Sequence, residues 1–193
     1  MTQSANVLGG ALWINLSNTV RMQDKNAVDR LQDPRALEEW LVDNELPASV
    51  RELPYVQALP LLTGLRELCG AVLLDLERLG RPTEATMSRL RELSSGIAVD
   101  VSLVWDEAGK PDLAYDGASA ADVLRYRVLR SIAETLRTIP PERIRKCEHE
   151  DCILRFADTS KSGKRRWCSM DSCGNRRKAA DFYARRKQQR AER

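Results

Sequence analysis

Hydrophobic residues recur at helical spacing through much of the first 140 residues. Asp33-Pro34 provides an N-cap followed by a proline, and apolar residues then share one helical face up to Asn44. A longer apolar stripe predicts a helix over 54–79, and similar patterns predict helices over 82–95 and 119–138. The first part of the chain is therefore predicted to be mainly helical.

One segment changes from helical to alternating periodicity. Val99, Val101, Leu103 and Trp105 alternate with other residues, which predicts a strand followed by a turn at 106–110 and a second strand near 113–115. Pro140-Pro141 ends the following helix. We expect a mainly α fold with a β-hairpin (α+β), divided into a helical domain over 1–141 and a second domain over 142–193.

The second domain is predicted to be small. Residues 153–157 have the pattern of a strand, 158–164 of a turn, and 165–168 of a returning strand, and a helix is expected to begin near Cys173. Phe182 and Tyr183 are expected to pack this helix onto the hairpin. Together these elements indicate a treble-clef-like zinc finger.

Charge is distributed unevenly between the two parts. Residues 1–142 contain 15 Lys/Arg and 21 Asp/Glu, whereas residues 143–193 contain 16 and 7, so the net charges are −6 and +9. A compact basic segment favours a polyanionic partner, with nucleic acid considered before an acidic protein. A basic but merely solvated tail remains an alternative. Neither a signal peptide nor a membrane-spanning segment is recognised, so we expect a soluble cytoplasmic protein.

Four clustered cysteines indicate a metal site. Cys147 and Cys152 are separated by four residues, as are Cys168 and Cys173, with fifteen residues between the two pairs. Paired thiolates at such spacing predict one structural Zn²⁺, which must contribute folding free energy because so short a domain has a small core. Cys69 lies far upstream in an apolar pattern and is expected to be a core residue.

Catalysis is not expected. Four thiolates complete the zinc coordination shell, whereas a catalytic zinc needs an open position. His149 is the single histidine, and with four cysteines available it is expected at the surface rather than as a ligand. We therefore predict that the protein is not an enzyme.

Specific motifs resemble two known families. The stretch Arg165-Arg166-Trp167-Cys168-Ser169-Met170, followed by Cys173-Gly174-Asn175-Arg176, resembles the CGNR zinc finger. The upstream stretch ALWINLSNTV, with Ile14-Asn15-Leu16-Ser17-Asn18-Thr19 where the family usually has FxNT, resembles the start of the ABATE domain. The resemblance implies a bacterial, stress-responsive transcription regulator whose finger binds DNA and whose larger domain senses a ligand. It also implies that the four cysteines bind zinc.

Basic side chains around and after the last cysteine are candidates for DNA contact. Arg pairs well with phosphate or guanine, and Asn pairs with adenine. Asn175 and Arg176 have an alternative role, which is to shape the turn that carries the zinc ligands. The candidate nucleic-acid-binding residues are Arg165, Arg166, Asn175, Arg176, Arg177, Lys178, Arg185 and Arg186.

Other partners remain open at this point. Asn15, Asn18 and Thr19 are polar residues in an apolar segment and could line a pocket for a small effector, or instead satisfy buried backbone groups. A homodimer is a reasonable expectation for a small regulator. The alternative to sequence-specific DNA binding is a zinc-stabilised module that binds a protein or RNA.

Overall fold

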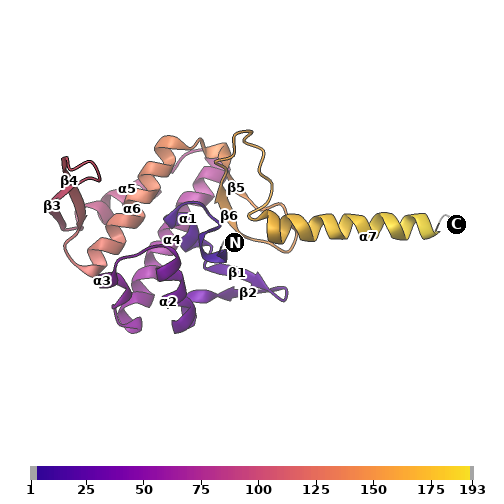
Figure 1. The fold of residues 1–193 in the computed structure, drawn as a ribbon, viewed down its shortest axis with the longest axis horizontal. Coiled ribbons are helices and arrows are strands. Elements are labelled where there is room, and N and C mark those ends of the chain that lie inside the picture. The colour runs from indigo at the N-terminus through magenta and orange to yellow at the C-terminus, as the bar shows by residue number, and fades with distance from the viewer. Residues whose placement is uncertain (1–3, 192–193) are drawn as a thin grey trace.

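The computed structural model describes residues 4–191 and confirms the α+β fold (Figure 1). Its six-helix first part is followed by a small cysteine-rich module and a final helix. The helices are α1 (Leu12–Ser17), α2 (Pro34–Asp43), α3 (Ala48–Arg51), α4 (Tyr55–Leu79), α5 (Glu84–Ser95), α6 (Ala120–Thr138) and α7 (Asn175–Ala191). The strands form three antiparallel pairs: β1 (Val20–Gln23) with β2 (Asn26–Asp29), β3 (Val99–Trp105) with β4 (Pro111–Gly117), and β5 (Ile144–Lys146) with β6 (Arg155–Ala157).

Helices α1, α4 and α6 form the centre of the hydrophobic core. Trp13 and Ile14 of α1 are fully buried, as are Leu62 on α4 and Leu124 on α6. The Trp13 indole Nε1 donates a hydrogen bond to Thr135 Oγ1 at 3.0 Å, which satisfies its one polar group inside the core. None of the described helices is both long enough and apolar enough to span a membrane.

Local capping signals fix the helix ends close to their predicted positions. The Asp33 carboxylate accepts a hydrogen bond from Arg35 N–H at the start of α2. Gly80 ends α4 in the left-handed conformation, with φ of 68°. Thr83 caps α5, so this helix begins slightly after the predicted start at residue 82.

The predicted hairpin is present as β3 and β4, and a second hairpin, which the sequence pattern did not predict, is formed by β1 and β2. Strands β1 and β2 are joined by Asp24 and Lys25, which have positive φ of 48° and 66°. Positive φ at both turn residues matches the twist of a tight two-residue hairpin. These residue types rarely signal such a turn, because glycine normally occupies at least one of the positions.

The small module differs from its predicted strand arrangement. Strand β6 pairs with β5, which precedes the first cysteine, and the predicted returning strand over 165–168 is wrong because these described residues form bends and loop. The cysteine knuckle therefore lies inside the β5–β6 hairpin. The module also docks on the helical domain, since Ile144 and Ala157 belong to the main core and Leu8 packs with the cysteines.

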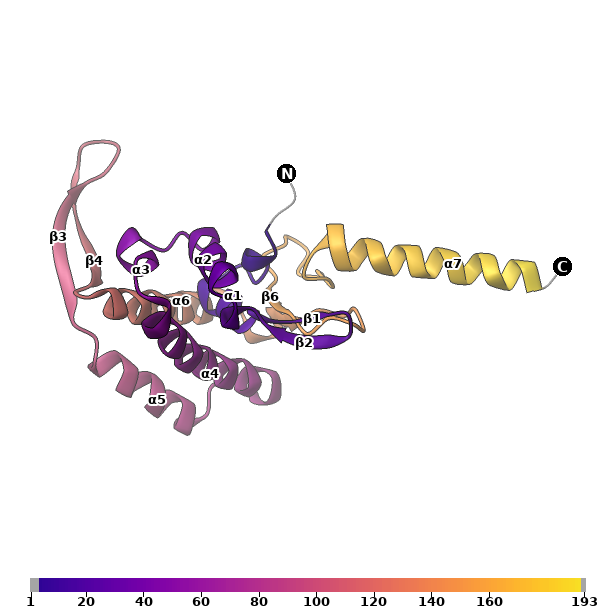
Figure 2. The same ribbon diagram turned by 90° about the horizontal axis from the view of Figure 1, so that it is seen from below.

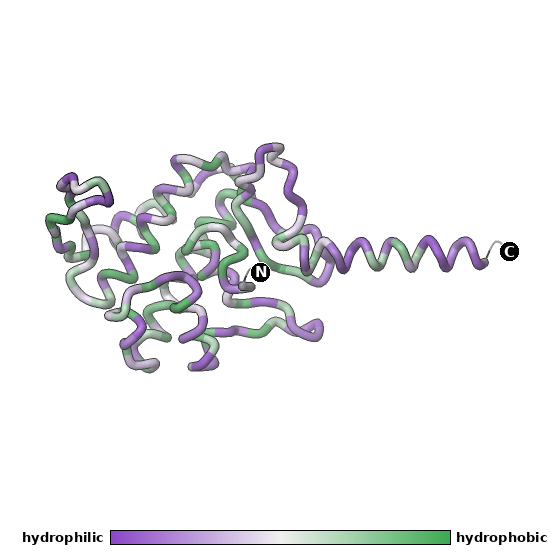
Figure 3. The backbone as a smooth tube through the Cα atoms, in the orientation of Figure 1, coloured by the Kyte–Doolittle hydropathy of each residue, from purple (hydrophilic) through white to green (hydrophobic). Residues whose placement is uncertain are grey.

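Helix α7 projects away from the body, at the end opposite the β3–β4 hairpin (Figures 1 and 2). The expectation that Phe182 and Tyr183 pack it onto the finger is wrong, because their relative exposures are 49% and 69%. The helix has no continuous apolar stripe, as its mostly hydrophilic trace in Figure 3 shows. Burying its isolated aromatic pair would also bury neighbouring basic residues, at a large desolvation cost.

Candidate metal centre and nucleic-acid interface

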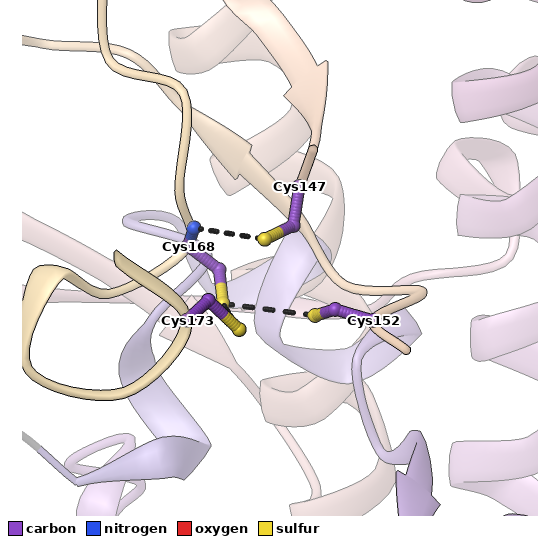
Figure 4. A group of neighbouring side chains, drawn as sticks. All are labelled: Cys147, Cys152, Cys168 and Cys173. Atoms are coloured by element: carbon purple, nitrogen blue, oxygen red, sulfur yellow. Dashed lines mark hydrogen bonds between the residues drawn. The ribbon is translucent and has the colours of Figure 1, made fainter. Parts of the chain in front are cut away.

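The first cysteine pair lies in a knuckle between β5 and β6. Cys147 follows β5, and its backbone N–H donates to the Leu154 carbonyl at 2.8 Å. Cys152 N–H donates to the His149 carbonyl at 3.0 Å and closes the turn. These bonds direct both side chains to the same side of the hairpin (Figure 4). His149 lies outside the sulfur cluster, and its Nδ1 accepts a hydrogen bond from Asp151 N–H.

The second pair lies at the entrance to α7. Cys168 is in the loop before a short π turn, Met170–Gly174, and Cys173 is within that turn. A Cβ on Gly174 would lie 2.5 Å from Met170 Sδ and 3.1 Å from the Trp167 ring, so a larger residue here would require the Met170 side chain to move. The turn and the helix that follows it fix Cys173 beside the other three cysteines.

The sulfur positions fit a tetrahedral metal site. All four thiol groups are buried, and their Sγ atoms lie within 4.8 Å of one another. The Cys168 Sγ atom is 3.8 Å from Cys152 Sγ and 3.6 Å from Cys173 Sγ. Four sulfurs at the usual Zn–S distance are about 3.8 Å apart, whereas a disulfide joins its sulfurs at about 2.0 Å. The donor set and its spacing therefore fit Zn²⁺.

Electrostatics also favour a bound cation. Hydrogen bonding with Cys147 raises the pKa of Cys152 to about 12, and the same neighbour raises the pKa of Cys168. Crowded thiols cannot all ionise at neutral pH unless a positive charge compensates them. Divalent zinc supplies that charge, and Arg176 Nη2 adds a weak contact with Cys173 Sγ at 3.5 Å.

Arg165 and Arg166 are neighbours in sequence but point in different directions. Arg165 stacks over Phe156 at 4.3 Å and donates hydrogen bonds to the carbonyls of Trp167, Cys168 and Leu8. Arg166 is exposed, pairs with Glu148 and lies over the Trp167 ring at 5.0 Å. The donors of Arg165 are thus occupied within the protein, whereas Arg166 is at the surface.

The Asp158 carboxylate stabilises the loop between β6 and Cys168. Its side chain is fully buried and accepts hydrogen bonds from the N–H groups of Ser160 and Arg165 at 3.0 and 2.9 Å. Burial raises the pKa of Asp158, but these bonds and the hydroxyl of Ser160 outweigh it and lower the pKa overall. The sequence offered no signal for this role beyond the position of Asp158 at the start of a predicted turn.

The remaining candidate DNA-binding residues lie on α7 and are exposed. Arg177 pairs with Asp181 at 3.0 Å, and the Asn175 side-chain amide donates to the Asp171 carbonyl at 3.4 Å. Seventeen helical residues extend about 25 Å, long enough to follow a groove of duplex DNA. The structure therefore groups most of the predicted basic set on one projecting element: Arg176, Arg177, Lys178, Arg185 and Arg186.

Comparison with known families decides what kind of protein carries this arrangement. The ABATE family model, described as "Putative stress-induced transcription regulator", matches residues 10–139, about two thirds of the chain. The chain belongs to the ABATE family. The CGNR zinc finger model matches residues 143–186. No curated protein matches the chain.

In this ABATE protein the four-cysteine cluster is a structural site for one zinc ion. Two observations agree on that assignment: the match to the CGNR finger and the spacing of the four buried sulfurs. Cys147, Cys152, Cys168 and Cys173 are the residues that would hold the metal. The ion supplies the positive charge that keeps four thiolates together, which the module needs because its own core is small.

The three residues predicted to form an ABATE ligand pocket are all buried and bonded within the protein. Asn15 accepts a hydrogen bond from Gly9 N–H at 2.8 Å and donates to Asn44 Oδ1 at 2.7 Å. Asn18 binds the backbone of Arg155, and Thr19 accepts from the Arg66 guanidinium. Asn15 lines a hollow of about 410 Å³. Ligand binding there stays a prediction.

Proposed function

We propose that this ABATE protein is a cytoplasmic bacterial transcription regulator that binds duplex DNA through α7 and Arg166. The observation that carries the proposal is the projecting basic helix fixed to a zinc finger. Residues 143–193 have a net charge of +9, and the candidate side chains on α7 are exposed, where they can meet phosphates. The protein acts by binding and has no catalytic role in this proposal.

Docking of α7 supplies affinity first and sequence preference second. Arginines and lysines that reach phosphates position the helix, while a few side chains read base edges. Asn175 lies at the N-terminal end of the helix, where it can reach an adenine edge. Arg166 lies over the Trp167 ring, which approaches Gly174 just before the helix begins. Arg165 and Arg176 support the finger instead, because their guanidinium groups contact its carbonyls and a zinc-ligand sulfur.

Binding of zinc-loaded full-length protein to fragmented genomic DNA, across a salt series, tests the proposal. We expect a few fragments to remain bound at physiological salt and to be lost with Cys168→Ser, which removes a zinc ligand. The double variant Arg185→Ala/Arg186→Ala should reduce the log–log salt slope by about 2. The matched control Arg81→Ala/Arg89→Ala, which removes the same charge from the helical domain, should leave the slope unchanged. Weak binding that is equal for all fragments would contradict sequence-specific regulation.

A second candidate is single-stranded RNA binding, which the exposed Phe182 and Tyr183 favour. These rings lie 5.7 Å apart among basic residues, and Arg186 lies over Phe182 at 5.7 Å. Unstacked bases commonly stack on such aromatic side chains. Tighter binding to single-stranded RNA than to duplex DNA, lost with Phe182→Ala/Tyr183→Ala, would replace DNA by RNA as the partner. Binding to an acidic protein but to neither nucleic acid would identify an interaction module.

A small-molecule effector belongs to the same proposal. The hollow beside Asn15 and a larger one of about 530 Å³, lined by Arg21 and Arg30, are the candidate sites. Both lie on the helical domain, and the Asn15 hollow borders Gly10, whose neighbour Gly9 bonds the finger through Ala157. Binding of an effector in the Asn15 hollow would act on the finger through Gly9 and its hydrogen bond with Ala157. Thermal stabilisation by a metabolite mixture, lost with Asn15→Ala, is the test.

A further inference from the structure

The β3–β4 hairpin stands outside the helical body as a two-stranded ribbon (Figure 2). Its seven-residue strands pair from Val99 with Gly117 to Trp105 with Pro111. At its base Asp116 forms an ion pair with Arg127 of α6 at 2.6 Å, and a Cβ on Gly117 would collide with Asp122 and Val123. The ribbon is therefore attached firmly at one end, while most of its length is exposed.

One face of the ribbon is almost wholly apolar. Directly paired residues in an antiparallel ladder point to the same face, so Val101 joins Tyr115 and Leu103 joins Leu113. Trp105 and Leu103 on this face are 64% and 57% exposed. We call these residues the ribbon patch: Val99, Val101, Leu103, Trp105, Pro111, Leu113 and Tyr115.

The opposite face is polar and acidic. It carries Asp100 paired with Asp116, and Val104 paired with Asp112. Residues 99–117 contain five acidic side chains and one lysine. The ribbon as a whole therefore repels nucleic acid and anionic lipid, and its apolar side needs a partner whose own contact surface is uncharged.

Leaving the ribbon patch in water is unfavourable. Two-stranded hairpins without a covered face are marginally stable, and monomeric proteins rarely expose apolar patches above a few hundred Å². The ribbon patch exposes on the order of 600 Å² of side chain. Within residues 4–191 no other element covers it, since most of its side chains are more than 40% exposed.

We propose that the ribbon patch is the interface of a homodimer, in which the patches of two copies face each other across a two-fold axis. Two such patches together bury about 1,200 Å², the lower end of the range for stable protein interfaces. A two-fold contact is self-complementary, so the same apolar face serves both partners. The acidic faces then point outward, away from each other, and remain hydrated.

The dimer is independent of DNA binding and leaves the finger uncovered. Helix α7 lies at the opposite end of the molecule from the ribbon, so joining two ribbons obstructs neither basic helix (Figure 1). Each dimer would carry two basic helices, which raises avidity for DNA when both are engaged. Dimerisation does not require nucleic acid, so the dimer should form even if the protein does not bind DNA.

Analytical ultracentrifugation of zinc-loaded full-length protein over a concentration series tests the dimer. The wild type should sediment as a dimer that dissociates on dilution. Leu103→Glu places charge in the ribbon patch and should weaken dimerisation at least about 100-fold. Ser102→Glu places the same charge on the adjacent, opposite-facing position and should leave the dimer intact. Unchanged zinc content and far-UV circular dichroism establish that both variants are folded.

Hydrogen exchange of the wild type gives a readout that needs no variant. Amides of β3 and β4 should exchange more slowly at high than at low protein concentration, because the second copy protects them. A wild type that stays monomeric at every concentration, or equal effects of the two Glu variants, would overturn the proposal. So would binding of the monomer to uncharged lipid vesicles through Leu103 in place of self-association.

Discussion

The side-chain amide of Asn18 forms two hydrogen bonds with the backbone of Arg155, 137 residues later in the chain. Its Nδ2 donates to the Arg155 carbonyl at 2.7 Å, and its Oδ1 accepts from the Arg155 N–H at 2.9 Å. The amide thus replaces a neighbouring strand at the free edge of β6. Nearby, the Gly9 carbonyl accepts from Ala157 N–H at 2.9 Å, and Glu77 pairs with the Arg155 guanidinium. The zinc finger is joined to the ABATE domain by specific bonds, in addition to apolar packing.

Replacing Asn18 by alanine should loosen this junction. Asn18→Ala leaves the backbone N–H and C=O of Arg155 without these partners, and we expect the free energy of unfolding to fall by about 2 kcal/mol. Urea unfolding of the zinc-loaded protein measures the change. Asn26→Ala is the control, because the Asn26 amide bonds the Asp24 carbonyl in an exposed turn and its loss should cost less than about 0.5 kcal/mol. Equal losses in both variants would contradict a special role for Asn18.

The parts that the sequence predicted well depend on local signals. The apolar stripe of α4 and the alternation of β3 need only neighbours along the chain, and the cysteine spacing identifies its own metal. The junction between the zinc finger and the ABATE domain does not depend on local signals. Asn18 stood out through the ABATE motif, but the partner that defines its role comes from the second domain, and nothing near Arg155 in the sequence indicates it.

The wrong prediction for α7 has a physical origin. The prediction assigned the apolar residues of a small domain to its own core, so Phe182 and Tyr183 were expected to pack inward. In the structure the sulfur cluster and Phe156 form that core, and Leu8 from the N-terminal segment completes it. Metal coordination and a docked neighbour thus replace the apolar contacts that α7 was expected to make.

The two adjacent arginines should separate finger stability from DNA affinity. Arg165→Ala removes a stack on Phe156 and several hydrogen bonds to carbonyls, so the finger should lose about 2 kcal/mol of stability and bind zinc more weakly in competition with a chelating dye. Arg166→Ala should keep wild-type zinc affinity and lower the DNA salt slope by about 1. Zinc loss in Arg166→Ala but not in Arg165→Ala would contradict the assignment of Arg165 to the finger and Arg166 to the surface.

Stability should depend on pH through Asp29 and Arg66, which form two hydrogen bonds of 2.6 Å. Hydrogen bonding with Arg66 lowers the pKa of Asp29 below its ordinary value. A lowered folded-state pKa stabilises the protein above the carboxyl pKa of the unfolded chain, and the contribution disappears as pH falls through the folded-state pKa. Asp29→Asn should therefore cost about 1 kcal/mol at pH 7 and progressively less below about pH 4.

Denaturant titrations over a pH series measure this difference. Asp100→Asn serves as the control, because that carboxylate lies on an exposed strand of the ribbon. Its effect on stability should stay small at every pH. A deficit in Asp29→Asn that persists unchanged in acid would show that the aspartate acts through shape and not through its charge.

Removing zinc should unfold the finger and leave the ABATE core folded. The apolar side chains around the cysteines form a cluster separate from the main core, so the two need not unfold together. After chelation, amides over 147–153 and 165–174, which surround the cysteines, should lose hydrogen-exchange protection while those of α4 and α6 keep it. Native mass spectrometry should find one zinc per chain before chelation and none after it. Loss of protection throughout α4 would show instead that the finger is required for the whole fold.

Helix α7 should become fully ordered only on DNA. It is polar on nearly all sides, and its supporting contact is with the turn Met170–Gly174 at its first turn. An isolated helix of this length is marginally stable in water, and clustered positive charges in its second half repel one another. Phosphates neutralise that repulsion, so binding and helix formation reinforce each other. Amides after Asp181 should exchange rapidly in the free protein and slowly in the DNA complex.

Ala184→Gly separates this coupling from direct contact, because it adds no charge and removes only a methyl group from an exposed position. Glycine disfavours the helix by about 1 kcal/mol. If α7 must become helical before it binds, DNA binding should therefore weaken roughly fivefold. The salt slope should stay unchanged, since the number of neutralised phosphates is the same. Unchanged affinity, together with slow exchange after Asp181 in the free protein, would mean that α7 is a rigid rod before it meets DNA.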